Sequence, residues 1–159
     1  MPLEMIRIDD RLIHGQVVVG WCPVLKPDRL ILCDDEVAQS EWEAEIYKDA
    51  ASDYQTSIYT VAEAAAALRS EQFKNEKLFL IVGSPEVIVR LTDLGLKINK
   101  VIVGGMHHQP GKRKILDFVY IDDRDLEYFR VLTERQVSLE AKDVPTCKSF
   151  DLAKKLGLN

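Results

Sequence analysis

The feature that most constrains the fold is a regular alternation between short apolar, strand-like runs and longer segments of helical periodicity. The strand-like runs occupy residues 5–8, 29–33, 57–60, 77–82, 100–103, 117–121 and 137–140. The helical patterns occupy residues 16–21, 40–50, 61–70, 85–94, 123–135 and 150–156. Nearly continuous apolar strands separated by amphipathic helices are typical of a parallel sheet with right-handed crossovers. We therefore predict a doubly wound α/β fold, an open and mostly parallel sheet of about seven strands with helices on both faces.

Length and composition fit one soluble domain covering residues 1–159, because a chain of this size can bury a sizeable core. No apolar run approaches the roughly 20 residues that span a bilayer, and the N-terminus lacks a secretory pattern. We therefore expect a cytoplasmic protein. Cys22, Cys33 and Cys147 show no C-x-x-C spacing and are expected to be reduced thiols. The formal charge of −5 argues against nucleic acid as the main partner.

The first candidate site is the segment from Arg7 to Gln16, in which an apolar strand leads into a charged turn and then a helix. This order places His14 near the carboxyl end of a strand, the edge where open α/β sheets bind ligands. The backbone N–H groups of Gly15 and Gln16, at the start of the helix, would favour an anion there. The segment therefore predicts a phosphate-binding site around His14.

The side chains of this turn suit phosphoryl transfer. A neutral imidazole at His14 offers a ring nitrogen as nucleophile, and the guanidinium of Arg11 forks onto two phosphate oxygens. A carboxylate that accepts the other ring N–H would orient His14, and we assign that role to Asp10. The alternative is structural: Arg7, Asp9, Asp10 and Arg11 would form a solvated ion-pair cluster, and His14 would only cap the helix.

The second candidate site is the loop of residues 103–114, which contains three glycines, two histidines and three consecutive cations. If its strand lies beside the first, Gly104 and Gly105 can form an anion-binding nest that helps to hold phosphate on His14. The cations at 112–114 could add charge toward an acidic partner, although surface cations are usually solvated. The histidines at 107 and 108 leave a zinc site open as a competing hypothesis, without the ligand spacing of known zinc motifs. We assign no metal and no cofactor.

The segment Arg7-Ile-Asp-Asp-Arg-Leu-Ile-His-Gly-Gln16 closely resembles the phosphorylation-site signature of IIB subunits in the mannose/fructose/sorbose class of the bacterial sugar phosphotransferase system. Asp34-Asp35-Glu36-Val37-Ala38, Val103-Gly104-Gly105-Met106 and Val144-Pro145 resemble further landmarks, so the similarity covers about residues 4–145. The resemblance implies that His14 carries phosphate from a phosphohistidine on a IIA domain to a sugar bound by a membrane IIC/IID permease. It also implies peripheral association with the inner face of the membrane through that permease, an antiparallel edge strand and a homodimer.

Two segments depart from the family pattern. Lys142 stands where an arginine is common in the family, which keeps the positive charge but loses the two-pronged hydrogen bonding of a guanidinium. Pro23 is expected to end the first helix early. These changes leave open a second function, a regulatory phosphoacceptor that does not serve sugar transport. Independently of these changes, Asp9 and Asp34 have a structural alternative, in which they cap helices or brace turns.

Overall fold

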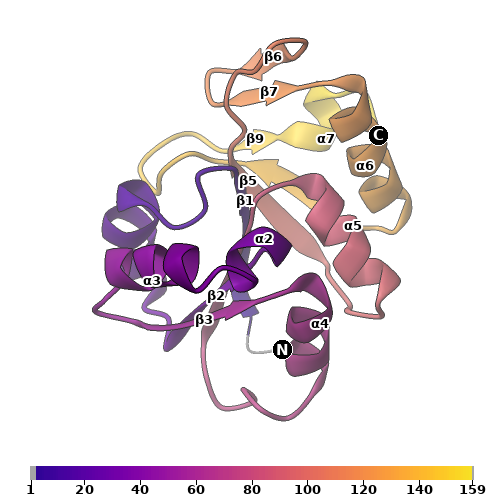
Figure 1. Ribbon diagram of the computed structural model, residues 1–159. Helices are drawn as coiled ribbons and strands as arrows, with labels where there is room; N and C mark the ends of the chain where they lie inside the picture. The colour runs from indigo at the N-terminus through magenta and orange to yellow at the C-terminus, as the bar shows by residue number, and fades with distance from the viewer. Residues whose placement is uncertain (1–2, 159) are drawn as a thin grey trace.

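The computed structural model describes residues 3–158, which form an α/β layered structure around a seven-stranded sheet (Figure 1). The strand order is β3-β2-β4-β1-β5-β8-β9. These strands are β1 (Leu3–Asp9), β2 (Arg29–Cys33), β3 (Gln55–Tyr59), β4 (Leu78–Val82), β5 (Lys100–Gly105), β8 (Ser138–Ala141) and β9 (Phe150–Asp151). All neighbouring strands are parallel except β8 and β9. The predicted fold class is confirmed, and β1 lies at the centre of the sheet.

Helical segments cover both faces of the sheet, as the alternation predicts. One apolar core packs under α4 (Val61–Arg69), α5 (Pro85–Asp93), α6 (Asp123–Glu134) and α7 (Leu152–Lys155). The opposite core packs under η1 (Gln16–Trp21), α1 (Cys22–Leu25), α2 (Asp35–Ala38) and α3 (Glu41–Ala50). The residues of β4 are buried throughout, which explains why this strand reads as an unbroken apolar run.

The expected antiparallel edge strand is present, but other strand predictions differ from the structure. Residues 117–121 do not join the main sheet; β6 (Arg113–Leu116) and β7 (Val119–Ile121) form a separate antiparallel hairpin, apart from the main sheet in Figure 1. The hairpin is attached through Met106, whose N–H donates to the carbonyl of Phe118 at 2.9 Å. The strand at 138–141 is parallel to β5, and the antiparallel edge is β9, at the start of the predicted C-terminal helix.

The first helical segment also differs from its prediction. Residues 16–21 form a π-helix, and Pro23 does not end the helical path, because it occupies the first turn of α1, where its missing N–H is not needed. The path ends at Lys26, which adopts a left-handed conformation with φ 49°. π-Helical segments are rare in proteins, and those that occur are often found near functional sites.

Candidate phosphoryl-transfer site

The loop after β1 brings His14 to the carboxyl edge of the central strand. Leu12 adopts a left-handed conformation with φ 61°, and its N–H donates to the carbonyl of Asp9 at 2.9 Å, closing a tight turn. Leu12 and Ile13 are buried and anchor the loop to the core. The side chain of His14 is 17% exposed, so its ring is fixed by its surroundings and still reaches solvent. The predicted location of His14 is confirmed.

The carboxylate that holds His14 belongs to Asp9. Its Oδ2 lies 2.8 Å from His14 Nε2, and its Oδ1 accepts the backbone N–H of Arg11 at 3.0 Å. Asp9 is fully buried, and burial alone would raise the pKa of its carboxyl. The hydrogen bonds from His14 and Arg11, with the charge of Arg7, outweigh burial and hold the pKa of Asp9 below its ordinary value. Asp9 is therefore an ionised hydrogen-bond acceptor at neutral pH.

The predicted pairing of Asp10 with His14 is wrong. Asp10 follows the end of β1, and its carboxylate faces the loop after β5: Oδ2 accepts the backbone N–H of His107 at 2.6 Å, and Oδ1 lies 2.5 Å from His107 Nδ1. Successive side chains of an extended chain point in opposite directions, so adjacent aspartates reach different partners. Asp10 therefore ties the second candidate loop to the first.

The contacts of the two ring nitrogens define the orientation of His14. Because ionised Asp9 accepts only, Nε2 carries the proton, and the lone pair of a neutral imidazole lies on Nδ1. The backbone N–H of Gln16 approaches Nδ1 at 3.3 Å, and Gln16 Oε1 accepts from Arg11 Nη2 at 2.8 Å. Arg11 is 38% exposed and also approaches Asp9 through Nε at 3.4 Å. Nδ1 thus lies beside a backbone donor and near a partly exposed guanidinium.

Arg7 forms a buried ion pair with Asp9, a role that the sequence did not predict. Its side chain is fully buried, and Nη2 lies 3.3 Å from Asp9 Oδ2. Nη1 and Nη2 also donate to the carbonyls of Lys142 and Asp143 at 3.0 and 2.9 Å. Burial lowers the pKa of Arg7, although the charge of Asp9 opposes this effect. The alternative of a solvated ion-pair cluster is therefore wrong for Arg7 and Asp9.

Trp21 packs against Arg7 and helps to hold it in place. Its ring centroid lies 5.4 Å from Arg7 Cζ, and its indole N–H donates to the carbonyl of Asp143 at 2.9 Å. The ammonium of Lys142 lies 6.0 Å from the same ring. The segment that carries Lys142 is thus held against η1 and over Arg7, within the structure that supports the His14 loop.

Gly104 and Gly105 leave space for neighbouring side chains and do not adopt the left-handed conformation that an anion-binding nest needs. Both are buried in β5, and neither has a positive φ. A Cβ on Gly104 would lie 1.8 Å from Arg7 Cζ, and one on Gly105 would lie 3.1 Å from Asp9 Oδ1. Gly104 and Gly105 therefore permit the buried Arg7 and Asp9 side chains to pack directly against β5. Two consecutive glycines at the end of an apolar strand were the available sequence signal for a large side chain packed against that strand.

The remaining polar residues of the two predicted sites have other partners. The three cations of the second loop form ion pairs: Lys112 with Asp125, Arg113 with Asp123 and Lys114 with Asp117. His108 packs edge-on against Tyr120, with ring centroids 5.3 Å apart. Asp34 caps α2 by accepting the N–H of Val37, as its structural alternative predicts. Between residues 3 and 158, no group of three or more His, Cys, Asp or Glu side chains is arranged to hold a metal ion.

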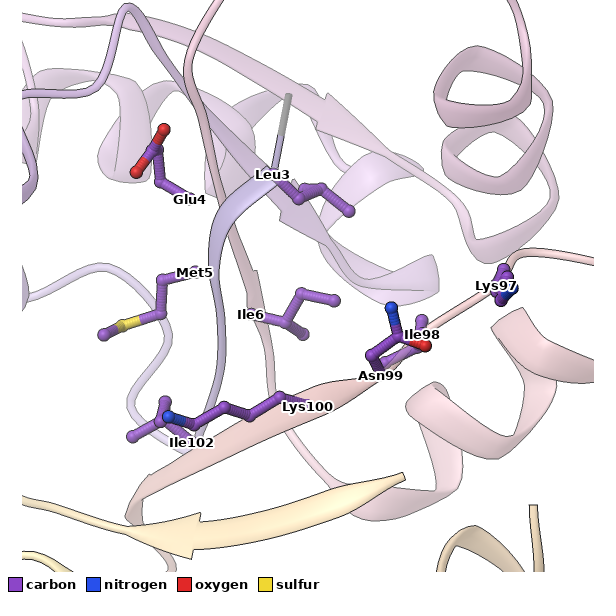
Figure 2. Close-up of a pocket in the computed structure, with 9 residues that line it drawn as sticks. All are labelled: Leu3, Glu4, Met5, Ile6, Lys97, Ile98, Asn99, Lys100 and Ile102. Atoms are coloured by element: carbon purple, nitrogen blue, oxygen red, sulfur yellow. The ribbon is translucent and has the colours of Figure 1, made fainter. Parts of the chain in front are cut away.

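A surface pocket of about 250 Å³, drawn in Figure 2, lies where β1 and β5 begin, whereas His14 follows the end of β1. Its walls combine apolar side chains with two lysines: Leu3, Glu4, Met5, Ile6, Lys97, Ile98, Asn99, Lys100 and Ile102. Lys100 is already paired with Glu140 at 2.6 Å. The pocket therefore lies away from the chemistry at His14.

The carboxyl edge of the central parallel strand thus carries a histidine oriented by an aspartate, beside a partly exposed arginine. Residues 3–159 match the family model described as the PTS system sorbose subfamily IIB component. The chain belongs to this family, the IIB components of the sugar phosphotransferase system, which act as phosphotransferases.

Relatives and solved structures agree with this membership. The chain is 33% identical to the fructose-specific EIIB component of Bacillus subtilis (strain 168) over 152 residues, 95% of this chain and 93% of that protein. It is 33% identical to the mannose-specific EIIAB component of Escherichia coli (strain K12), covering 98% of this chain and 50% of that protein. The crystal structure of the IIBSor domain of the sorbose permease from Klebsiella pneumoniae superposes with a TM-score of 0.91 at 30% identity, covering 99% and 97% of the two chains. Within residues 3–158, no helix combines the length and apolar character needed to cross a membrane.

Proposed function

We propose that His14 accepts a phosphoryl group from a phosphohistidine of a IIA protein and passes it to a sugar bound by membrane IIC/IID subunits. The observation that carries this proposal is the contact between Asp9 Oδ2 and His14 Nε2, because it leaves Nδ1 as the nucleophile. The mannose-specific relative, whose name joins IIA and IIB in one protein, supports a IIA partner. Association with the inner face of the membrane would then follow from docking to the permease.

In the proposed transfer, the Nδ1 lone pair of His14 attacks phosphorus in line with the donor nitrogen. The new N–P bond forms as the donor N–P bond breaks, and its electron pair returns to the donor imidazole. Asp9 holds the proton on Nε2 and stabilises the positive charge that the ring gains. Arg11 and the N–H of Gln16 bind the phosphoryl oxygens, which is the positioning and charge stabilisation that phosphoryl transfer needs.

The site residues then fall into two groups. His14 is the catalytic nucleophile, Arg11 the charge-stabilising residue, and Gly15 and Gln16 the backbone that faces phosphate. Asp9 and Arg7 are positioning residues, and Asp10 positions the loop after β5 through His107. Gly104 and Gly105 contribute by leaving room for Arg7 and Asp9.

The test is phosphorylation of the purified chain by phosphoenolpyruvate, the general phosphotransferase proteins and a IIA protein, followed by addition of permease membranes and sugar. We expect an acid-labile phosphate on His14 that is discharged only when membranes and sugar are both present. The variant His14→Ala should accept none. Phosphorylation without discharge would favour a regulatory phosphoacceptor, and no phosphorylation beside an active IIB control would contradict the proposal.

A further inference from the structure

Exposed apolar side chains gather on two helical segments beside His14. Residues 3–158 contain five exposed large apolar side chains, and four of them lie on η1, α1 and α3: Val19, Val24, Trp42 and Ile46. Trp42 is 74% exposed and stands one helical turn from Ile46, so both lie on one face of α3. Scattered apolar residues are normal on a surface, but a group that includes an exposed tryptophan is typical of an interaction site.

The two segments lie on the same side of the sheet, and the first of them, residues 16–25, adjoins the site. Val18 and Leu25 pack against the same buried core as Ala44 and Tyr47, so η1, α1 and α3 cover a common face, as Figure 1 also shows. The segment η1 begins two residues after His14. A partner that reaches His14 from this side would therefore meet these exposed side chains.

The second of these segments, residues 34–50, is also rich in carboxylates. Residues 34–50 contain seven carboxylates and one lysine, a net charge of −6, whereas the whole chain carries −5. Glu36, Glu41, Glu45 and Asp49 are exposed there. Residues 16–25 contain no charged side chain. We call the exposed side chains of residues 16–25 and 34–50 the acidic-apolar surface.

We infer that the acidic-apolar surface docks the chain onto the cytoplasmic side of the membrane permease. Cytoplasmic loops of membrane proteins carry an excess of Lys and Arg, which complements this charge. The lipid headgroups of the inner leaflet are anionic and would repel the surface, so its partner is a protein with basic loops and not the bilayer itself. This inference rests on the proposed function and adds the surface that contacts the permease when phosphate passes from His14 to the sugar.

Two double variants and one matched control test the inference. Trp42→Ala with Ile46→Ala removes the apolar contact, and Glu41→Gln with Glu45→Gln removes two exposed charges without touching the cap of α3 at Glu43. Leu94→Ala with Glu134→Gln changes an exposed apolar and an exposed acidic residue elsewhere. Each variant is phosphorylated by the donor proteins, then discharged to sugar by inverted vesicles from the cells that produce this chain. Thermal unfolding checks that each variant is folded.

We expect both surface variants to need roughly tenfold more phosphorylated protein for half-maximal discharge, because a few interface residues carry most of the binding energy. The maximal discharge rate and phosphorylation by the donor should not change, and added salt should weaken discharge of the wild type more than that of the glutamine variant. The control should match the wild type.

Unchanged discharge would overturn the inference. Slower phosphorylation with normal discharge would assign the surface to the donor, and loss of a wild-type dimer in sedimentation would assign it to a second copy of the chain; either result also overturns it. If the wild type itself is not phosphorylated, or is phosphorylated but not discharged, the proposed function fails, and the docking inference fails with it. A failure confined to the variants concerns only the docking surface.

Discussion

Asp9 and Arg7 form a fully buried ion pair directly beneath His14, with Arg7 Nη2 at 3.3 Å from Asp9 Oδ2. The pair packs against Gly104 and Gly105 of β5, and its aspartate also holds the ring of His14 at 2.8 Å. Removing one member of a buried pair leaves the other charge uncompensated, which is far more costly than losing an exposed ion pair. The support of the site and the stability of the fold therefore depend on the same two side chains.

We expect Asp9→Asn to be destabilised by about 3–5 kcal/mol and to accept phosphate much more slowly, because Arg7 loses its counter-charge and His14 loses the acceptor that fixes its proton. Denaturant unfolding and the rate of phosphorylation measure the two effects. The matched change Asp10→Asn should retain more of the unfolding free energy and more of the phosphorylation rate, because Asp10 contacts His107 and not His14. A larger loss in Asp10→Asn would contradict the assignment of Asp9.

The stabilisation from Asp9 should depend on pH with a definite sign. Because the folded-state pKa of Asp9 is lowered, its contribution is fully present above the unfolded-state value of about 4 and is lost as pH falls through the folded-state pKa. The difference in unfolding free energy between wild type and Asp9→Asn should therefore be constant near neutral pH and shrink below about pH 4. Urea titrations at a series of pH values measure it; a difference that grows on acidification would show that the pKa of Asp9 is raised.

Gly104→Ala should destabilise the fold by about 3 kcal/mol, at the upper end of ordinary overpacking, and lower the melting temperature by roughly 10 °C. The new Cβ would lie 1.8 Å from Arg7 Cζ, so the buried guanidinium must move away from Asp9. Gly20→Ala is the control, because its Cβ would meet only the Pro145 ring at 3.8 Å. Equal melting temperatures for the two variants would mean that Gly104 does not make room for Arg7.

The three cysteines should differ sharply in reactivity. Burial raises the pKa of Cys22 to about 11 and that of Cys33 to about 12, while Cys147 is exposed. Because the thiolate is the reactive form, a thiol reagent at mildly alkaline pH should label one cysteine rapidly in the folded protein and three after unfolding. Cys147→Ser should abolish the rapid phase, and rapid labelling that persists in this variant would show that a second cysteine is accessible.

The sequence allows the fold and the position of His14 to be predicted because both depend on local patterns. Alternating apolar strands and amphipathic helices determine a parallel sheet, and a strand followed by a turn and a helix places His14 at the carboxyl edge. The hairpin of β6 and β7 was missed because a short apolar run at 117–121 gives the same pattern in a hairpin as in a central strand.

The support of the site could not be read from local patterns, because it depends on long-range contacts. Arg7 meets the carbonyls of residues 142 and 143, more than 130 positions away in the sequence. Asp9 and Asp10 are adjacent residues of the same type. Only the direction of each side chain at the end of β1 decides which one contacts His14. The shared face of Arg7 and Asp9, two residues apart on one strand, was the available signal.

The most direct test is to identify the phosphorylated ring nitrogen. The chain is labelled with ¹⁵N-histidine, phosphorylated as described above, and examined by NMR at alkaline pH for one-bond coupling between ³¹P and ¹⁵N. We expect a single phosphohistidine at His14 with phosphorus on Nδ1, because Asp9 holds the proton on Nε2. Phosphate on Nε2 of His14, or on another histidine, would contradict the role of Asp9 and the proposed transfer.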